Sequence, residues 1–171
     1  MIDFAGPYIR DSSGVMYSEA KLEKEMGSQS GIPVEYLCVS NGTTAQDYLK
    51  GEGIPADQDE CFRRFADRTD VVVGVVTDLS ILTTYAHQFG ATAIPAVWRN
   101  DPSKYPVHDE RYGIAMPDDN PALCRELTTS IDEFLADHDD GWDRAFSDHL
   151  QGVDDRDKHK PAHADPGLCG D

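Results

Sequence analysis

Asp78 follows a run of strand-forming residues, and a carboxylate in that position could bind a cation. The run, residues 71–76, is all valine but for one glycine, and it ends at Thr77 and Asp78. An unbroken β-branched run is typical of a strand covered on both faces, as in a parallel or mixed sheet. Residues 79–89 then repeat apolar side chains at helical spacing, with Gly90 as a helix end. Asp78 should therefore lie at the carboxyl end of a buried strand, where α/β sheets bind ligands.

A second junction between a strand and a helix carries hydroxyl groups. The apolar run 34–39 leads into Ser40, Gly42, Thr43 and Thr44. Gly42 permits a tight turn, and either threonine can cap the helix that follows while its first amide groups point outward. A helix start of this kind favours a carboxylate or a phosphate. An ordinary turn would explain the same residues, so this motif alone decides nothing.

The elements that must position these residues alternate between strands and helices. Further strands are expected at residues 14–17, 92–98 and 111–117, and further helices at 55–68, 121–135 and 141–150. This alternation predicts an α/β fold, with a mixed sheet of about five strands, helices on both faces and residues 71–76 in the centre. Residues 5–8 are read as a turn. Residues 151–171 are read as a solvated tail, with metal binding by its histidines as the alternative.

Composition excludes several classes of function. The 171 residues carry 32 acidic and 15 basic side chains, a formal net charge of -17, which argues against a nucleic-acid partner. The four cysteines lack the paired spacing of a zinc site, so neither a metal nor another cofactor is expected. The cysteine count by itself leaves disulfides and free thiols open.

Five stretches follow one another in a characteristic order: residues 2–8 (IDFAGPY), 40–44 (SNGTT), 75–78 (VVTD), 111–117 (RYGIAMP) and the closing helix 142–150. Together they resemble the solute-binding proteins of amino-acid ABC importers, family 3, the polar amino-acid type that includes glutamate and glutamine receptors. The resemblance implies a periplasmic-binding-protein-like fold of type II. Residues 1–110 would form lobe two with the first hinge strand, 111–150 the second hinge strand and C-terminal helices of lobe one, and 151–171 a tail. The N-terminal part of lobe one, with its carboxylate-binding arginine, has no counterpart here.

The resemblance also implies a ligand site and partners. Asp78 would bind the ammonium of an amino acid such as glutamate or glutamine. Thr44 would hold its carboxylate and Thr43 would shape the turn, while Thr77 and Ser40 are weaker candidates for contact. The expected partner is the ABC permease, and no catalytic residue is expected. One alternative is an enzyme that uses Asp78 as a phosphoryl acceptor or metal ligand, which would need a second acid and a lysine nearby. Another is a non-transporting interaction module.

Resemblance to the actinobacterial glutamate-binding branch implies two disulfides, Cys38–Cys61 and Cys124–Cys169. Disulfides would place the protein outside the cell or on its surface, in an oxidising environment. Without the rest of lobe one, the apolar stripe of the C-terminal helices should be bare. With such a stripe, the helices should fold back onto lobe two, pair with a second copy or be disordered.

Overall fold

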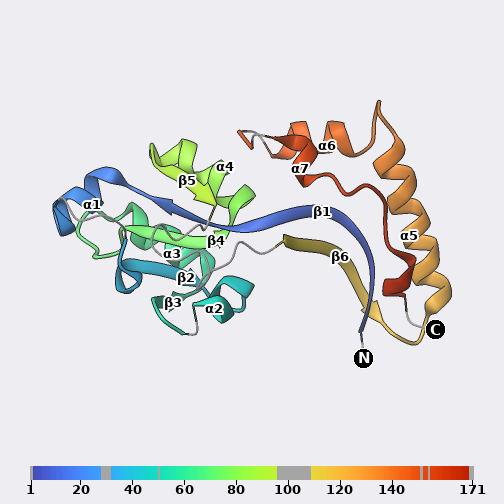
Figure 1. Ribbon diagram of the computed structural model, residues 1–171, viewed down its shortest axis with the longest axis horizontal. Coiled ribbons are helices and arrows are strands. Elements are labelled where there is room, and N and C mark those ends of the chain that lie inside the picture. The colour runs from blue at the N-terminus through green and yellow to red at the C-terminus, as the bar shows by residue number, and fades with distance from the viewer. Residues whose placement is uncertain are drawn as a thin grey trace. The chain divides into compact units, whose positions relative to one another are not determined.

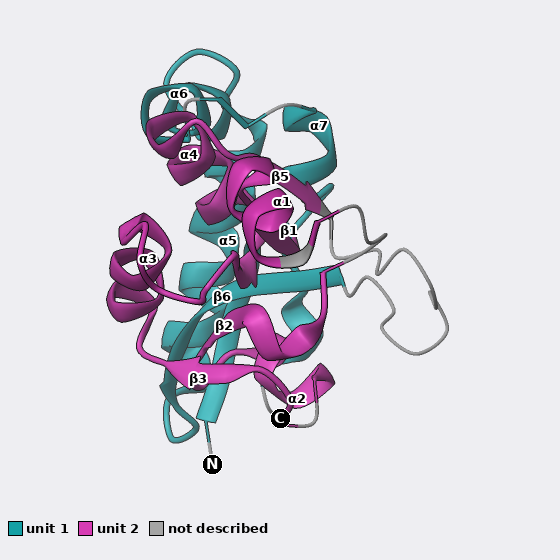
Figure 2. Cartoon of the chain, turned by 90° about the vertical axis from the view of Figure 1, so that its left-hand side faces the viewer, with its two compact units in different colours: residues 1–11, 109–171 teal, residues 12–108 magenta. Residues whose placement is uncertain are grey.

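The computed structural model describes residues 2–27, 32–49, 51–95, 109–150, 152–153 and 155–169. Two compact units divide the chain: unit 1 comprises residues 1–11 and 109–171, and unit 2 comprises residues 12–108 (Figure 2). Strand β1 (Ile2–Tyr17) contributes its first part to unit 1 and its second part to unit 2 (Figure 1).

Unit 2 is built on a mixed sheet with the strand order β3–β2–β4–β1–β5, as predicted for the α/β class. Its further strands are β2 (Leu37–Ser40), β3 (Ile54–Ala56), β4 (Gly74–Asp78) and β5 (Thr92–Pro95). β2 pairs in parallel with both β3 and β4, whereas β1 runs antiparallel to β4 and β5. The valine-rich strand is therefore central and residues 92–95 are at the edge, as the sequence predicted; residues 96–98 lie outside the described part.

Helices cover both faces of this sheet. They are α1 (Glu19–Met26), α2 (Thr44–Tyr48), α3 (Gln58–Ala66) and α4 (Leu79–Phe89), with a 3-10 turn at Val34–Tyr36. Because neighbouring strand residues point to opposite faces, β4 serves two cores. Val75 packs with Cys61 and Leu82 on the α3–α4 face, and Val76 packs with Ala45 on the α2 face.

The junction between β4 and α4 matches its sequence signals. Asp78 is the N-cap residue of α4, and Gly90 ends the helix in the left-handed region (φ 59, ψ 36), donating its N–H to the carbonyl of Ala86. β4 itself begins later than the valine run. Val73, the residue before β4, donates its N–H to the carbonyl of Tyr36 at 3.0 Å, and its own carbonyl accepts the N–H of Ser18 at 3.2 Å.

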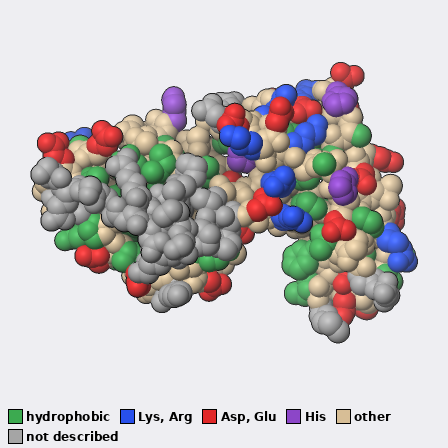
Figure 3. All heavy atoms as spheres, in the orientation of Figure 1, with side chains coloured by type: hydrophobic (Ala, Val, Ile, Leu, Met, Phe, Trp, Pro, Cys, Tyr) green, Lys and Arg blue, Asp and Glu red, His purple; other side chains and the backbone are tan. Residues whose placement is uncertain are grey.

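Unit 1 joins the two ends of the chain. Strand β6 (Asp109–Pro117) pairs with β1, and the helices are α5 (Pro121–Ala136), α6 (Trp142–His149) and α7 (Arg156–His159), with a 3-10 turn at Pro166–Leu168. Acidic and basic side chains alternate over the region of α6 and α7 (Figure 3). Asp143 of α6 is paired with Lys160 at 2.8 Å and with Arg156 at 3.3 Å. No helix in the described ranges is long and apolar enough to cross a membrane.

Both disulfides expected from the resemblance are present, one in each unit. Cys38–Cys61 ties β2 to α3, and Cys124–Cys169 ties α5 to the C-terminal segment. Each pair holds together two segments that also pack through apolar side chains.

The C-terminal segment is not the solvated tail that we expected. His159, Ala164 and Cys169 are buried in the core of unit 1. The Nδ1–H of His159 donates to the carbonyl of Arg10 at 2.9 Å, and the N–H of Asp165 donates to the carbonyl of Gly6 at 2.6 Å. The disulfide between Cys169 and Cys124 holds the end of this segment against α5.

The apolar stripe expected to be bare on the C-terminal helices is covered over most of its length, although Phe134 remains 37% exposed. Ile131, Trp142 and Phe146 are buried, because β1, β6 and the C-terminal segment cover them. Residues 5–8, expected to form a turn, continue β1. Gly6 lies there against Gly113 of β6, where a side chain at Gly6 would come within 2.9 Å of the Gly113 Cα.

Candidate functional site

The parallel strands of unit 2 end together at one edge of the sheet. Ser40, the last residue of β2, pairs with Ala56, the last residue of β3. On the other side of β2, Val39 pairs with Val76 of β4. Continuing this register by two residues brings Asn41, Asp57 and Asp78 to the same level. The edge is therefore formed by three polar side chains from three neighbouring strand ends.

β1 adds a fourth polar residue to this level. Ser13 lies directly opposite Asp78 in the antiparallel pairing of β1 with β4, so the two side chains share a face. The Ser13 side chain is 3% exposed, and its hydroxyl has no hydrogen-bond partner among the described residues. Asp78 is half-buried. A buried hydroxyl thus stands beside a partly accessible carboxylate.

Gly14 explains why β1 can pass so close to Asp78. A Cβ at Gly14 would lie 2.9 Å from Cδ1, 3.0 Å from Cα and 3.1 Å from Cβ of Leu79, the first residue of α4. The contacts to Leu79 Cα and Cβ are tighter than most real Cβ contacts, so a side chain at Gly14 would require the start of α4 to shift. Gly14 therefore fixes the position of Ser13 against the start of α4.

Asn41 links the strand ends to the turn that precedes α2. Its Nδ2 donates to Asp57 Oδ1 at 3.4 Å, and its Oδ1 accepts from Gln46 Nε2 at 3.3 Å. Gln46 Oε1 in turn accepts the backbone N–H of Gly42 at 2.9 Å. This network orients Asp57 and holds the turn, and Gly42 adopts the positive φ of 70° that the turn requires.

The two threonines of the turn have different surroundings. Thr43 occupies the N-cap position of α2, but its hydroxyl donates to the carbonyl of Ser40 at 2.7 Å rather than capping the helix. Thr44 is the first residue of α2, and its side chain is exposed. The threonine nearest solvent at the helix start is thus Thr44.

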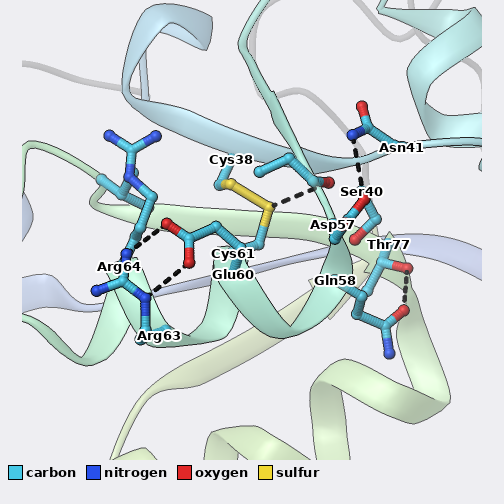
Figure 4. Close-up of a disulfide and its surroundings, with 12 residues drawn as sticks. Cys38, Ser40, Asn41, Asp57, Gln58, Glu60, Cys61, Arg63, Arg64 and Thr77 are labelled. Carbon is cyan, nitrogen blue, oxygen red and sulfur yellow. Dashed lines mark hydrogen bonds and ion pairs between the residues drawn. A yellow bond between two sulfur atoms is a disulfide. The ribbon is translucent and has the colours of Figure 1, made fainter.

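Ser40 and Thr77 are buried on the opposite face, towards α3 (Figure 4). The Thr77 hydroxyl makes a long hydrogen bond of 3.5 Å to Gln58 Oε1, and the Ser40 hydroxyl has no partner in the described part of the chain. The structure therefore separates the five residues singled out by sequence. Asp78 lies on the face of Asn41 and Asp57, whereas Ser40 and Thr77 lie behind it.

Ser13 and Asp57 were missed by the sequence analysis. Ser13 belongs to an unremarkable polar stretch, and Asp57 fell inside an expected helix. Only the strand register brings them beside Asp78 and Asn41. β3 has three residues and is followed by Asp57, which is too short a pattern to recognise.

At the amino end of the strands, charged side chains are engaged in hydrogen bonds and an ion pair. The Nζ of Lys21 donates to the carbonyls of Asp67 at 2.7 Å and Val72 at 3.0 Å, and burial lowers the pKa of this ammonium. Arg64 binds Asp70 at 2.9 Å and holds the pKa of that carboxyl below its usual range. These pairs close α3 against the start of β4, far from Asp78.

The described residues include no group of three or more His, Cys, Asp or Glu side chains arranged to hold a metal ion. The carboxyl edge instead presents separate carboxylates, amides and hydroxyls. Chemically, such an arrangement can accept hydrogen bonds from an ammonium group and order it without a metal.

No protein family model and no curated protein matches this sequence. Solved structures match its fold. A cysteine-binding protein from Campylobacter jejuni aligns with a TM-score of 0.67 and 16% identity, covering 94% of this chain and 63% of that one. An ancestral arginine-binding protein bound to glutamine aligns with a TM-score of 0.62 and 18% identity, covering 89% of this chain and 64% of that one. A putative binding component of an ABC transporter from Wolinella succinogenes, complexed with lysine, aligns with a TM-score of 0.63 and 16% identity. It covers 88% of this chain and 63% of that one.

These similarities establish the fold as that of amino-acid-binding proteins of ABC transporters, at low sequence identity. The chain spans about 63% of the length of the structures it matches.

Proposed function

We propose that this chain is a solute-binding component of an ABC importer, or part of one, and binds an α-amino acid at the carboxyl edge of unit 2. The observation that carries the proposal is Asp78, a half-buried carboxylate at the end of a central strand, opposite the Ser13 hydroxyl, which is buried without a partner among the described residues. In α/β sheets of this kind, ligands bind outside the carboxyl ends of the strands.

An α-amino acid carries an ammonium and a carboxylate on one carbon, and the edge offers a partner for each. Asp78 accepts the ammonium in a charge-assisted hydrogen bond. The exposed start of α2, at Thr44, receives the carboxylate through its backbone N–H and hydroxyl, and Thr43 fixes the turn through its bond to Ser40. Ser40 and Thr77 support the strand ends from behind. In this assignment unit 2 corresponds to lobe two and unit 1 to the hinge and returning helices.

The proposal places the protein outside the cell or on its surface. Both disulfides persist only in an oxidising environment. Its macromolecular partner would be the permease of the importer.

The enzymatic alternative needs a lysine near Asp78, and none of the lysines in the described part of unit 2 lies there. A second acid, Asp57, is indeed present at the edge, but the described lysines of unit 2 lie at the opposite end of the strands. Phosphoryl chemistry at Asp78 would require a nearby cation. A binding role uses the residues that are present.

Titration followed by amide NMR tests the proposal on the whole chain. An ion pair at an open edge contributes only about 0–1 kcal/mol, so we expect millimolar or weaker binding. Glutamate, glutamine, aspartate and lysine would be added in turn, and shifts should centre on residues 41–45 and 77–80. Asp78→Asn should remove the shifts. Shifts that persist unchanged in this variant, or that centre elsewhere, would refute the assignment.

A second candidate function is a protein-interaction module that does not transport. It is favoured by apolar side chains exposed in unit 1, among them Ile2 at 64% and Phe4 at 45% on β1. Light scattering across a concentration series tests for association of two copies. A monomer at every concentration, with amino-acid binding intact, would contradict this second function and leave amino-acid binding as the function proposed.

A further inference from the structure

A row of polar side chains crosses the carboxyl edge of unit 2. Asp57, Asn41, Asp78 and Ser13 follow one another over β3, β2, β4 and β1. Their common level and the alternation of strand side chains place all four on the face of α2, and the Asn41–Asp57 hydrogen bond agrees with this. The two carboxylates stand two strand spacings apart, roughly 10 Å at the backbone.

The basic residues described in unit 2 gather at the other end of its strands. They belong to α1 or to the end of α3 and the residues just after it, and they are Lys21, Lys24, Arg63, Arg64 and Arg68. Hydrogen bonds to Val72 and Asp67 fix Lys21 where β4 begins. In the described part of unit 2, Lys and Arg side chains therefore lie at the amino edge, among acids such as Asp70 with which they pair, whereas the carboxyl edge carries acids and amides without a described Lys or Arg.

The acids are not the only sign of a ligand at this edge. The hydroxyl of Ser13 is buried without a described partner and faces the same side as Asp78. Burying an unpartnered hydroxyl costs free energy, which a ligand group that orders Asp78 and Ser13 together would offset. Asn41 is already engaged by Gln46 and Asp57, so it holds Asp57 in place.

We infer that the ligand is an amino acid whose side chain carries a positive charge, such as lysine, ornithine or arginine. This inference rests on the proposed function. Asp78 binds the α-ammonium, and Asp57 binds the second cation at the far end of an extended side chain. A glutamate side chain would instead place its carboxylate towards Asp57, where like charges repel.

Competition between ligands tests this inference with the same NMR titration. Lysine should bind about fivefold more tightly than glutamine, and glutamine more tightly than glutamate, as expected for one partly exposed charge pair. Asp57→Asn should bring lysine down to the level of glutamine and leave glutamine unchanged. Glu23→Gln removes the same charge from α1 at the opposite edge, and it should leave every affinity unchanged.

The outcomes separate the two proposals. Equal binding of lysine and glutamine, both weakened by Asp78→Asn, would overturn the inference and keep the proposed function. A lysine preference that survives Asp57→Asn would likewise overturn the role of Asp57. If no amino acid shifts the edge resonances, both proposals are wrong. Circular dichroism of each variant confirms that the fold is intact.

Discussion

The two units of this chain differ in where their polar groups join distant segments. Unit 1 closes on itself: Trp142 Nε1–H donates to the carbonyl of Tyr8 at 2.7 Å, and Arg10 binds Asp109 at 3.0 Å. In unit 2, Lys21 and Arg64 join α1 and α3 to the amino end of β4, and the carboxyl end carries the shorter-range network of Asn41. Among the described residues, the Ser13 and Ser40 hydroxyls of unit 2 and Asp3 Oδ2 of unit 1 are buried without partners.

The difference follows from how the units are assembled. Unit 2 is a single stretch, residues 12–108, whereas unit 1 joins residues 1–11 to residues 109–171. Joining distant segments costs loop-closure entropy, which side-chain contacts between the ends of the chain must offset. A unit that folds as one stretch needs fewer such contacts.

Removal of each disulfide gives the largest expected effect and tests this contrast. Loss of either pair should cost about 2–5 kcal/mol. The cysteines of unit 1 are 45 residues apart and those of unit 2 are 23 apart. Loop entropy alone then makes Cys124→Ala/Cys169→Ala more destabilising than Cys38→Ala/Cys61→Ala by about 0.6 kcal/mol. Urea unfolding with hydrogen exchange resolved by unit provides the measurement. The contrast fails if the unit 2 pair proves the more costly.

Glycine substitutions sharpen the contrast between closure and binding. Gly14→Ala places a methyl group against Leu79, and Gly113→Ala places one 2.9 Å from the carbonyl oxygen of Ala5. Both should lose about 1–3 kcal/mol of stability through overpacking. Only Gly14→Ala displaces Ser13 from Asp78, so only it should weaken amino-acid binding in the NMR titration. Equal loss of binding in both variants would show that unit 1 governs the site.

The smallest expected effect is the loss of unfolding free energy in acid, compared for one ion pair from each unit. Lys160 lowers the pKa of Asp143 in unit 1, and Arg64 lowers that of Asp70 in unit 2. Because each folded pKa lies below its unfolded value, the stabilisation is present at neutral pH and is lost as the pH falls through the folded pKa. Each pair should contribute roughly 1 kcal/mol or less.

Urea unfolding of Asp143→Asn and Asp70→Asn at pH 7 and at pH 2.5 or so, well below the ordinary aspartate pKa of about 4, measures this. The variants should be weaker than the parent at pH 7 and should approach it in acid. A constant difference across the range would mean that packing, not charge, holds these contacts.

Local patterns in the sequence predicted those elements that local forces decide. The helix after Asp78 ends at Gly90 as expected, and Asn120 caps α5 through its bond to the N–H of Leu123. Residues 55–68 were expected to be one helix, but they divide into the end of β3 and α3, because pairing with β2 outweighs the helical pattern. The buried C-terminal segment was missed since its contacts are with distant residues such as Arg10.

The candidate site, like the fold, could be predicted only where residues close together in the sequence determine it. Asp78 could be placed at a strand end from its own neighbours, because a valine run and a helical period meet there. Ser13 and Asp57 could not, because register between strands that are distant in sequence puts them beside Asp78 and Asn41. No pattern within either stretch encodes that register.

The Cys124–Cys169 bond has a mechanical consequence. Tension applied between Ile2 and Cys169 passes from the sulfur of Cys169 directly to Cys124 and on towards β6. Residues 125–168, which include most of α5 and all of α6 and α7, lie outside the path of the force. A pulling experiment should therefore lengthen the oxidised chain by less than the Cys124→Ala/Cys169→Ala variant, which keeps Cys38–Cys61, and the difference should correspond to the contour length of that covalent loop.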